Sequence, residues 1–236
     1  MALTDRQQQI LLASIREHIK TARPVASEML AGRRGLDVSS ASIRNDMLEL
    51  ENSGYLTQPH TSAGRVPTAK AYQFYLDHFL ERDMEPPKAE QDAIRSVVRK
   101  YSDHAERMKM LAKTMAGICE TTVIVSFAQR DVYYTGISYL FHQPEFAHLD
   151  SLLSMSDLVD HLDDVVADVF DAVSEEPAIL VGPKNPFGGD TGVLLAKYGP
   201  TSRSDLVGIL GPLRMAYDDN LSILRFAQHC FSPSHA

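Results

Sequence analysis

The sequence has only two cysteines, no uninterrupted apolar run long enough to cross a membrane and no surplus of positive charge. Cys119 and Cys230 follow no metal-binding or redox spacing, which favours buried reduced thiols over a disulfide. A membrane-spanning helix needs about 18 or more apolar residues in a row, and the first residues lack the basic and apolar regions of a secretory signal. We therefore expect a cytoplasmic protein with no membrane partner.

Charge is distributed unevenly along the chain. The formal net charge is -8, yet residues 1–80 hold nine Lys or Arg and eight Asp or Glu, so the acidic surplus lies entirely in the remainder. This leaves room for a DNA-binding head on an acidic body, although a balance of +1 is a weak basic footprint. At 236 residues the chain is long enough for one large or two ordinary domains.

The N-terminal third has the element order of a winged helix-turn-helix. A first helix is expected behind a capping box that starts at Thr4, followed by a short second helix and a third helix from about Ser39 to Gly54. Two short strands are expected on either side of PHTSAG, and helical spacing resumes behind Thr68. This order predicts a winged-helix domain over residues 1–82.

The rest of the chain is predicted to form a separate α+β domain. Apolar residues from Ile94 to Cys119 alternate three and four apart, which predicts a long amphipathic helix within a linker segment, 83–120. The wide apolar stripe favours packing on its own domain, and an intermolecular helix pair is the alternative. Over 121–236, strand-like runs such as VYYTGISYLF alternate with helices, among them one expected over 151–173. This predicts an antiparallel or mixed sheet of about five strands covered by helices.

The third helix and the hairpin carry the candidate DNA contacts. In a winged helix the third helix lies in the major groove, and its free N–H groups favour an anion at the start. Arg44 can contact guanine or a phosphate, Asn45 suits adenine, and Arg65 supplies charge at the hairpin tip, beside the sugar–phosphate backbone or a minor groove. Each residue alone could be a helix cap or a solvated side chain, but together with the helix order they favour DNA contact. The candidates are Ser39, Ser40, Ser42, Arg44, Asn45, His60, Thr61, Ser62 and Arg65.

No arrangement of residues indicates catalysis or a cofactor. The nine histidines include no close pair with metal-ligand spacing and a Cys or carboxylate partner. The glycine-rich NPFGGDTG lacks the Lys-Ser/Thr of a phosphate loop, so a turn between strands is expected. The aspartates of DHLDDVVAD are interpreted as a solvated helix face instead of paired catalytic carboxylates. We therefore expect a protein that is not an enzyme and uses no cofactor or metal.

Several segments resemble the HrcA family, the heat-inducible transcriptional repressors of bacteria. The resemblance is dense in LTDRQQQILLASIREHI and in VSSASIRNDMLELENSGYLTQPHTSAGRVPTAKAYQFYLDHFL, and it continues in YLFHQPEF, GPKNPFGGDTGVLLAKY and VGILGPLRMAYDDNLSIL. It implies a winged-helix head and a GAF-like body in a homodimer that represses chaperone genes through an inverted-repeat DNA operator of the CIRCE type. It also implies the chaperonin GroEL as a partner that maintains the active repressor.

The chain departs from the family pattern in its second half. Family members generally carry a dimerising insertion in the GAF-like region, whereas TTVIVSFAQRDVYYTGISYLFHQPEF passes almost directly from the first strand to the sequence after that insertion. The helix expected from Ile94 to Cys119 is the obvious substitute as a dimer contact. Leu213 and Ala216 also replace residues that are usually polar in the family.

Two functions of different classes follow from these observations. The first is a sequence-specific, DNA-binding transcriptional repressor of heat-shock genes. The second is a small-molecule-sensing or protein-interaction module whose winged helix does not bind DNA, and the near-neutral head with its acidic body keeps this alternative open. Salt-dependent DNA affinity separates the two, because neutralising phosphates releases counterions.

Overall fold

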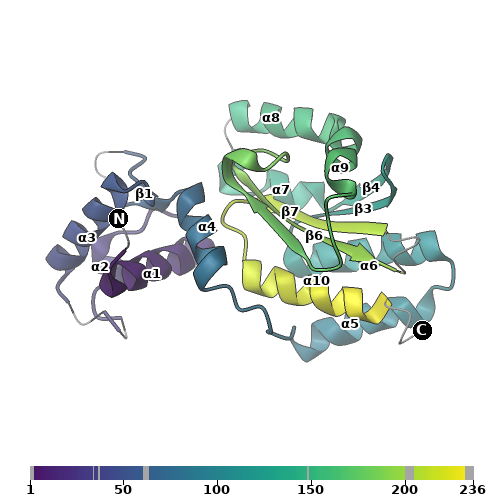
Figure 1. Cartoon of the computed structure of the whole chain (residues 1–236), viewed down its shortest axis with the longest axis horizontal. Coiled ribbons are helices and arrows are strands. Elements are labelled where there is room, and N and C mark those ends of the chain that lie inside the picture. Colours follow the sequence, from purple (N-terminus) through teal and green to yellow (C-terminus); the bar gives the residue numbers. More distant parts are fainter. Residues whose placement is uncertain are drawn as a thin grey trace. The chain divides into compact units, whose positions relative to one another are not determined.

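A computed structural model describes residues 3–33, 35–36, 38–60, 64–147, 149–199 and 205–231. The chain divides into two compact units, Met1–Leu80 and Glu81–Ala236 (Figure 1). Helices and antiparallel strands occur together, which confirms the predicted α+β class. None of the described helices is long and apolar enough to span a membrane.

The first unit consists of helices packed around a two-stranded hairpin. Its two strands pair antiparallel, with Leu56 opposite Pro67 and Thr57 opposite Val66. The first helix packs against the third and fourth helices and the second strand, so one apolar core serves helices and hairpin alike. In chain order the elements are α1 (Asp5–Thr21), α2 (Ser27–Leu30), α3 (Ser40–Asn52), β1 (Leu56–Thr57), β2 (Val66–Pro67) and α4 (Ala69–His78).

The apolar face of α1 supplies the centre of this core. Ile10, Leu11 and Ile15 are fully buried, as their helical spacing predicts. The predicted capping box is confirmed, because the Thr4 hydroxyl accepts from the Gln7 N–H at 3.3 Å and the Gln7 side chain accepts from the Thr4 N–H at 3.0 Å. The cap fixes where α1 begins and therefore which of its residues face the core.

Helix α3 ends in a glycine-dependent turn that leads into the hairpin. Gly54 has a φ of 77°, and its N–H donates to the Glu51 carbonyl at 2.9 Å. The Tyr55 N–H donates to the Leu50 carbonyl at 2.9 Å, which completes a Schellman motif. The Thr68 hydroxyl caps α4 and also donates to the Gly54 carbonyl at 2.7 Å. The ends predicted at Gly54 and Thr68 are therefore confirmed, and this turn sets the direction in which the hairpin leaves α3.

The single long helix expected from Ile94 to Cys119 is wrong, because two helices occupy this part of the second unit. They are α5 (Lys88–Lys100) and α6 (His104–Cys119). Tyr101 adopts an extended conformation, and the Asp103 carboxylate accepts from the Glu106 N–H at 2.8 Å as the cap of a new helix. An aspartate that caps a helix locally competes with continuation of the preceding helix, and the apolar spacing alone does not report this competition.

The apolar stripe of α6 packs inside its own unit. Met108, Leu111, Ala112 and Met115 are all fully buried, and α6 contacts α5 and the sheet. This is the interpretation that the width of the stripe favours. The alternative of an intermolecular pair along this stripe is therefore wrong, because the residues that would form it are already covered.

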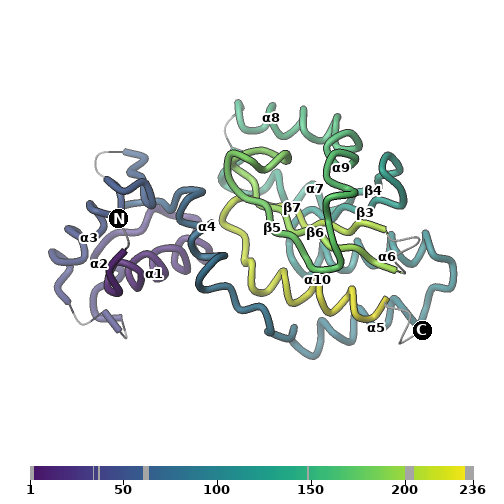
Figure 2. The backbone as a smooth tube through the Cα atoms, in the orientation of Figure 1, coloured from purple at the N-terminus to yellow at the C-terminus, as the bar shows by residue number. Residues whose placement is uncertain are grey.

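A five-stranded antiparallel sheet forms the middle of the second unit, as predicted. Its order is β4-β3-β7-β6-β5, so the first and last strands of the unit are neighbours and the third lies at an edge (Figure 2). The longest pairing joins β6 to β7, from Thr191 opposite Pro212 to Tyr198 opposite Asp205. The strands are β3 (Thr122–Ala128), β4 (Asp131–Thr135), β5 (Ala178–Val181), β6 (Thr191–Tyr198) and β7 (Asp205–Pro212).

Helices cover both faces of this sheet (Figure 1). Helix α6 and the last helix, α10 (Tyr217–Phe231), pack on one face together with α5. On the other face, alternate strand residues such as Ile124 and Leu195 join a core with Phe146 and Val166. The elements that follow β4 on this side are α7 (Ile137–Phe141), a 3-10 turn (Pro144–Phe146), α8 (Leu149–Asp160) and α9 (Leu162–Phe170).

Two further boundaries differ from the sequence-based expectation. The run VYYTGISYLF is a strand only as far as Thr135, because Gly136 turns the chain at a φ of 82° into α7. A Cβ at Gly136 would lie 2.4 Å from the Thr121 carbonyl oxygen, so this turn requires glycine. The helix expected over 151–173 is interrupted at His161, whose backbone leaves helical geometry and whose ring nitrogen contacts the Asp157 carbonyl at 2.9 Å.

The burial of Met108 yields a stability prediction. Met108→Ala should lower the free energy of unfolding of the second unit by about 2–5 kcal/mol, because it leaves a cavity in a closed core. Lys113→Ala on the exposed side of the same helix is the control and should change it by less than about 0.5 kcal/mol. Chemical denaturation checks both, and sedimentation is measured in parallel. A Met108→Ala protein of unchanged stability that dissociates would show that the stripe acts between chains.

Candidate nucleic-acid interface

The first half of α3 carries most of the residues that the sequence singles out. Arg44 and Asn45 are exposed one turn into the helix, and Ile43 and Met47 are buried on the opposite side. Neither the Arg44 nor the Asn45 side chain makes a hydrogen bond or ion pair with any residue that the structure describes. Both side chains are therefore available to an external partner. Arg44 offers a charged guanidinium group with N–H donors, and Asn45 offers a paired donor and acceptor.

The start of α3 combines a serine cap with open backbone donors. The Ser39 hydroxyl accepts from the Ser42 N–H at 3.2 Å and lies 3.1 Å from the Ser42 hydroxyl, so both serines are engaged within the helix start. Ser39 is thus the N-cap of α3, and a helix cap is the simpler of the two roles that the sequence allows for it. The first acceptor of the helix is the Ser39 carbonyl, which receives the Ile43 N–H, so the N–H groups of Ser40 and Ala41 have no acceptor within the helix and point out of its end, where a phosphate would be favoured.

All three carboxylates of α3 are bound by other segments of the first unit. Arg6 of α1 holds Asp46 with two hydrogen bonds, from Nε at 2.8 Å and from Nη2 at 3.0 Å, and the Asp46 side chain is only 6% exposed. The Gln7 amide donates to the Glu49 carboxylate at 2.6 Å. Arg65 donates through Nε to the Glu51 carboxylate at 2.8 Å. Among the described side chains of α3, Arg44 is then the charged group without a partner, and the face around it is not dominated by negative charge.

Arg65 lies in a different setting from the hairpin tip that the sequence indicates. Its side chain is 12% exposed and paired with Glu51. Its backbone forms an antiparallel bridge with Val25, in which each N–H donates to the other's carbonyl at 2.8 and 2.9 Å. A Cβ at Gly64 would lie 2.4 Å from the Val25 carbonyl oxygen, so glycine is needed here for close backbone approach. Arg65 therefore ties the hairpin to α3 at its base.

The tip itself is only partly described. His60 is exposed and lies three residues after the end of β1 at Thr57. Thr61 and Ser62 lie outside the described residues. The structure therefore brings Ser39, Ser40, Ser42, Arg44 and Asn45 together in the first half of α3, whereas Arg65 is paired with Glu51 near the end of this helix.

Sequence reasoning missed one residue of this face, Leu48. Its side chain is 48% exposed, four residues beyond Arg44 and three beyond Asn45. This spacing puts it on the same side of the helix. The helical period contained the signal, because Leu48 falls outside the buried set of Ile43, Met47 and Leu50.

In the second unit, two segments that carry the family resemblance meet through one arginine. Arg214, from the GPLRMAY segment, pairs with the Glu145 carboxylate and donates to the Gln143 side chain at 2.6 Å. The Arg214 side chain is mostly buried in this pairing. Both partners of Arg214 belong to the same unit. The arginine therefore has a structural role, and we call this side-chain link between two distant segments a clasp.

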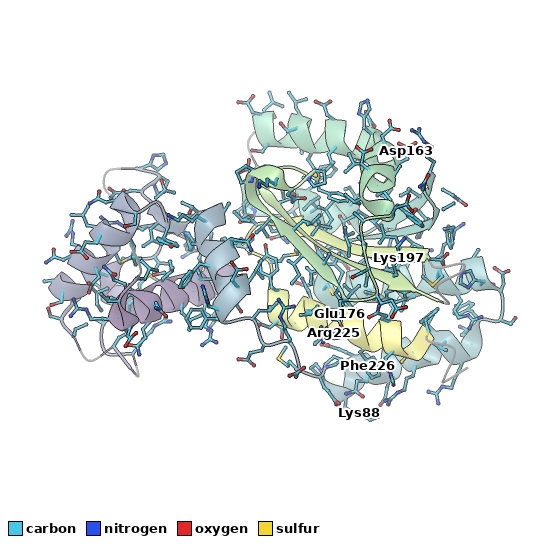
Figure 3. All side chains as sticks on the ribbon, viewed as in Figure 1. Lys88, Asp163, Glu176, Lys197, Arg225 and Phe226 are labelled. Atoms are coloured by element: carbon cyan, nitrogen blue, oxygen red, sulfur yellow. The ribbon has the colours of Figure 1, made fainter. Side chains whose placement is uncertain are left out.

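Other polar clusters of the second unit also have structural roles. The Asn185 amide donates to the carbonyls of Gly188 and Thr191 at 3.1 and 3.0 Å, so the glycine-rich segment is a hydrogen-bonded turn before β6. In α10, Arg225 donates to the Glu176 carboxylate at 2.8 Å and ties the helix to the segment before β5 (Figure 3). No group of three or more His, Cys, Asp or Glu in the described ranges could hold a metal ion.

The two cysteines are free thiols and both are half-buried. Burial raises the pKa of the Cys119 thiol to about 12, with the nearby Glu90 and Asp219 carboxylates adding to the shift. A thiol with this pKa is almost entirely protonated at neutral pH. Because the thiolate is the nucleophilic form, Cys119 is poorly suited to nucleophilic chemistry.

Comparison with known proteins finds one family model and several curated relatives that this chain matches. Residues 75–220 match the family model of the HrcA protein C-terminal domain. A heat-inducible transcription repressor HrcA from Caldanaerobacter subterraneus subsp. tengcongensis is 39% identical over 128 residues, which is 52% of this chain and 36% of that protein. One from Chloroflexus aurantiacus is 52% identical over 93 residues, which is 39% of this chain and 25% of that protein. The match to these curated relatives thus spans about a third of their length or less.

A solved structure shares the fold across the whole chain. The crystal structure of a hypothetical protein at 2.2 Å resolution superposes with a TM-score of 0.79 and covers 99% of this chain and 99% of that one. The two sequences are 18% identical, so the likeness concerns the fold alone.

The pairing of Arg65 with Glu51 yields a prediction about the first unit. Arg65→Ala should destabilise it by about 1–3 kcal/mol, because the partly buried Glu51 carboxylate loses its charged donor. Arg44→Ala removes the same charge from an exposed site and should change stability by less than about 0.5 kcal/mol. Hydrogen exchange of the α3 and hairpin amides locates the effect, and a cycle with Glu51→Ala isolates the pair. Equal effects of the two arginine variants would show that the pair does not hold the hairpin.

Proposed function

The chain belongs to the HrcA family, and from this premise we propose that it is a transcriptional repressor of heat-shock genes that binds a DNA operator through its first unit. The observation that carries the proposal is the exposed face of α3. There Arg44 and Asn45 are without partners among the described residues, while every carboxylate of the helix is held by a donor from another segment. A helix with this distribution can approach a phosphate-lined groove without presenting unpaired negative charge.

We propose that residues 1–82 act as a winged-helix domain. In such a domain α3 enters the major groove, with its first turn nearest the phosphates and base edges. The N–H groups of Ser40 and Ala41 would face a phosphate, and Ser39 and Ser42 keep this end of the helix small. Arg44 would contact guanine O6 and N7 or a phosphate, and Asn45 would bind adenine N6 and N7.

The hairpin is proposed to contact DNA through its tip, with His60, Thr61 and Ser62 as the candidate residues. Arg65 has a different proposed role from the one that its charge alone indicates. Because it pairs with Glu51 and its backbone is bridged to Val25, we propose that it positions the hairpin relative to α3. A wing held in this way would place its tip along the adjacent sugar–phosphate backbone or minor groove.

The second unit is proposed to be a GAF-like body that holds two copies of the chain together. Support comes from the β4-β3-β7-β6-β5 order of its antiparallel sheet and the helices on both faces. A homodimer would place two copies of α3 on an inverted-repeat operator of the CIRCE type. The buried stripe of α6 cannot serve as the dimer contact, so the contact must use another surface. The chaperonin GroEL is the further partner that membership of the family implies.

The alternative is a small-molecule-sensing or protein-interaction module that does not bind DNA. The balance of +1 over residues 1–80 supports it. Selection of binding sites from random duplexes separates the two functions, because a repressor enriches an inverted repeat and its affinity falls steeply with salt concentration. Recovery of no defined sequence, together with DNA affinity that does not change with salt, would favour the alternative.

Asn45 provides the sharpest test of base contact. Asn45→Ala should weaken binding to the selected inverted repeat by about 1–3 kcal/mol per half-site, because a bidentate contact with adenine is lost. Non-specific affinity should hardly change, since no charge is removed. Asn52→Ala is the matched control, because Asn52 is exposed on the same helix about 10 Å further along its axis. Titrations of an inverted repeat, a single half-site and a random duplex at one salt concentration measure these effects.

Two outcomes of these titrations would contradict parts of the proposal. Equal wild-type affinity for all three duplexes would overturn the operator function. An unchanged ratio of specific to non-specific affinity in Asn45→Ala would remove Asn45 from the base-reading residues and leave the repressor function standing.

A further inference from the structure

Leu48 is a large apolar side chain on the proposed DNA-facing side of α3. It is 48% exposed, while the other large apolar residues of the helix, Ile43, Met47 and Leu50, are fully buried. Among the described residues of the first unit, Leu48 shares such exposure with Met29 of α2. A single exposed leucine is ordinary on a protein surface, so the significance of Leu48 depends on its position and on its neighbours.

Leu48 lies in line with the two proposed base-reading residues. Arg44 precedes it by four residues and Asn45 by three, so all three project from one side of the helix. Four residues of α-helix advance about 6 Å, and successive bases of a strand are about 3.4 Å apart. The Leu48 side chain would therefore reach a base edge within about two steps of the base pair that Arg44 or Asn45 contacts.

In these surroundings, the interaction that Leu48 can make with DNA is a contact with another apolar group. Its neighbour Glu49 is held by the Gln7 amide at 2.6 Å, which engages the adjacent carboxylate with α1. An aliphatic side chain can neither donate to nor accept from a base. In the major groove the apolar feature of a base pair is the C5-methyl group of thymine.

We propose that Leu48 contacts a thymine C5-methyl group in the operator and thereby contributes to sequence specificity. This inference rests on the proposed DNA-binding function and deepens it, because it states which base chemistry the middle of α3 recognises. The contact discriminates by excluding water from the methyl group, so it adds apolar burial to the hydrogen bonds proposed for Arg44 and Asn45.

Replacing thymine by deoxyuridine tests this inference without altering the protein. Deoxyuridine keeps the Watson–Crick and groove hydrogen-bonding groups of thymine and lacks only the methyl group. Each thymine of the duplex selected by the wild-type chain is replaced in turn, in both half-sites, and affinity is measured at one salt concentration. We expect one position at which wild-type affinity falls about fourfold per half-site, the loss that corresponds to one buried methyl group.

Protein variants then identify the residue that reads that methyl group. Leu48→Ala should bind the thymine duplex more weakly than the wild type and should no longer distinguish thymine from deoxyuridine at the sensitive position. Leu48→Gln, which keeps the length of the side chain, should behave in the same way. Met29→Ala is the matched control: it truncates the other large apolar side chain that is exposed in the described part of the unit, and it should keep the wild-type sensitivity.

The outcomes separate this inference from the function on which it rests. A defined operator whose affinity is unchanged by deoxyuridine at every position overturns the role of Leu48 and leaves the repressor function intact. Sensitivity that persists in both Leu48 variants also overturns it, because another residue then contacts the methyl group. Failure of the wild type to select any sequence overturns the proposed function itself. The deoxyuridine measurement on the wild type does not depend on how well any variant folds.

Discussion

The pairing of the α3 carboxylates with donors from other segments is the constraint on which the first unit depends. Asp46 is buried and receives two hydrogen bonds from Arg6, so α1 and α3 are joined by a charged contact as well as by their apolar core. Glu51 and Arg65 join α3 to the hairpin in the same manner. A buried carboxylate is costly without a partner, so the pair of Arg6 with Asp46 in particular favours the observed placement of α1 against α3.

The same pairs explain how an almost neutral unit can present a local site for a polyanion. The balance of +1 is a sum over residues 1–80. A ligand in contact with α3 responds instead to where the individual charges lie. Two basic residues, Arg6 and Arg65, are used to engage acids of α3, and Arg44 stays exposed. Net charge is therefore a poor guide here, because much of the acidity of α3 is neutralised within the unit.

Local signals in the sequence predicted much of the fold, and contacts between distant residues account for what it missed. The cap at Thr4, the turn at Gly54 and the five strands follow from short patterns, and each is confirmed. The break before α6 was missed because a cap competes with apolar spacing. Arg65 was misplaced because its partner, Glu51, lies fourteen residues away and no local pattern reports the pair. In the candidate site, spacing located the exposed face of α3 but not the pairing of its acids.

The clasp of Arg214 on Gln143 and Glu145 has a consequence for how the length of the chain can vary. It anchors the segment just after α7 to a strand end about seventy residues further along the chain. The connection between β4 and α7 therefore has both flanks fixed, by strand pairing on one side and by this clasp on the other. At present this connection is the single residue Gly136, a tight turn to which the low cost of lengthening a flexible loop, about 0.6 kcal/mol for each doubling of its length, does not apply. An insertion here would have to replace this turn, but the strand pairing and the clasp both lie outside it, so they would still hold the sheet and its covering helices together.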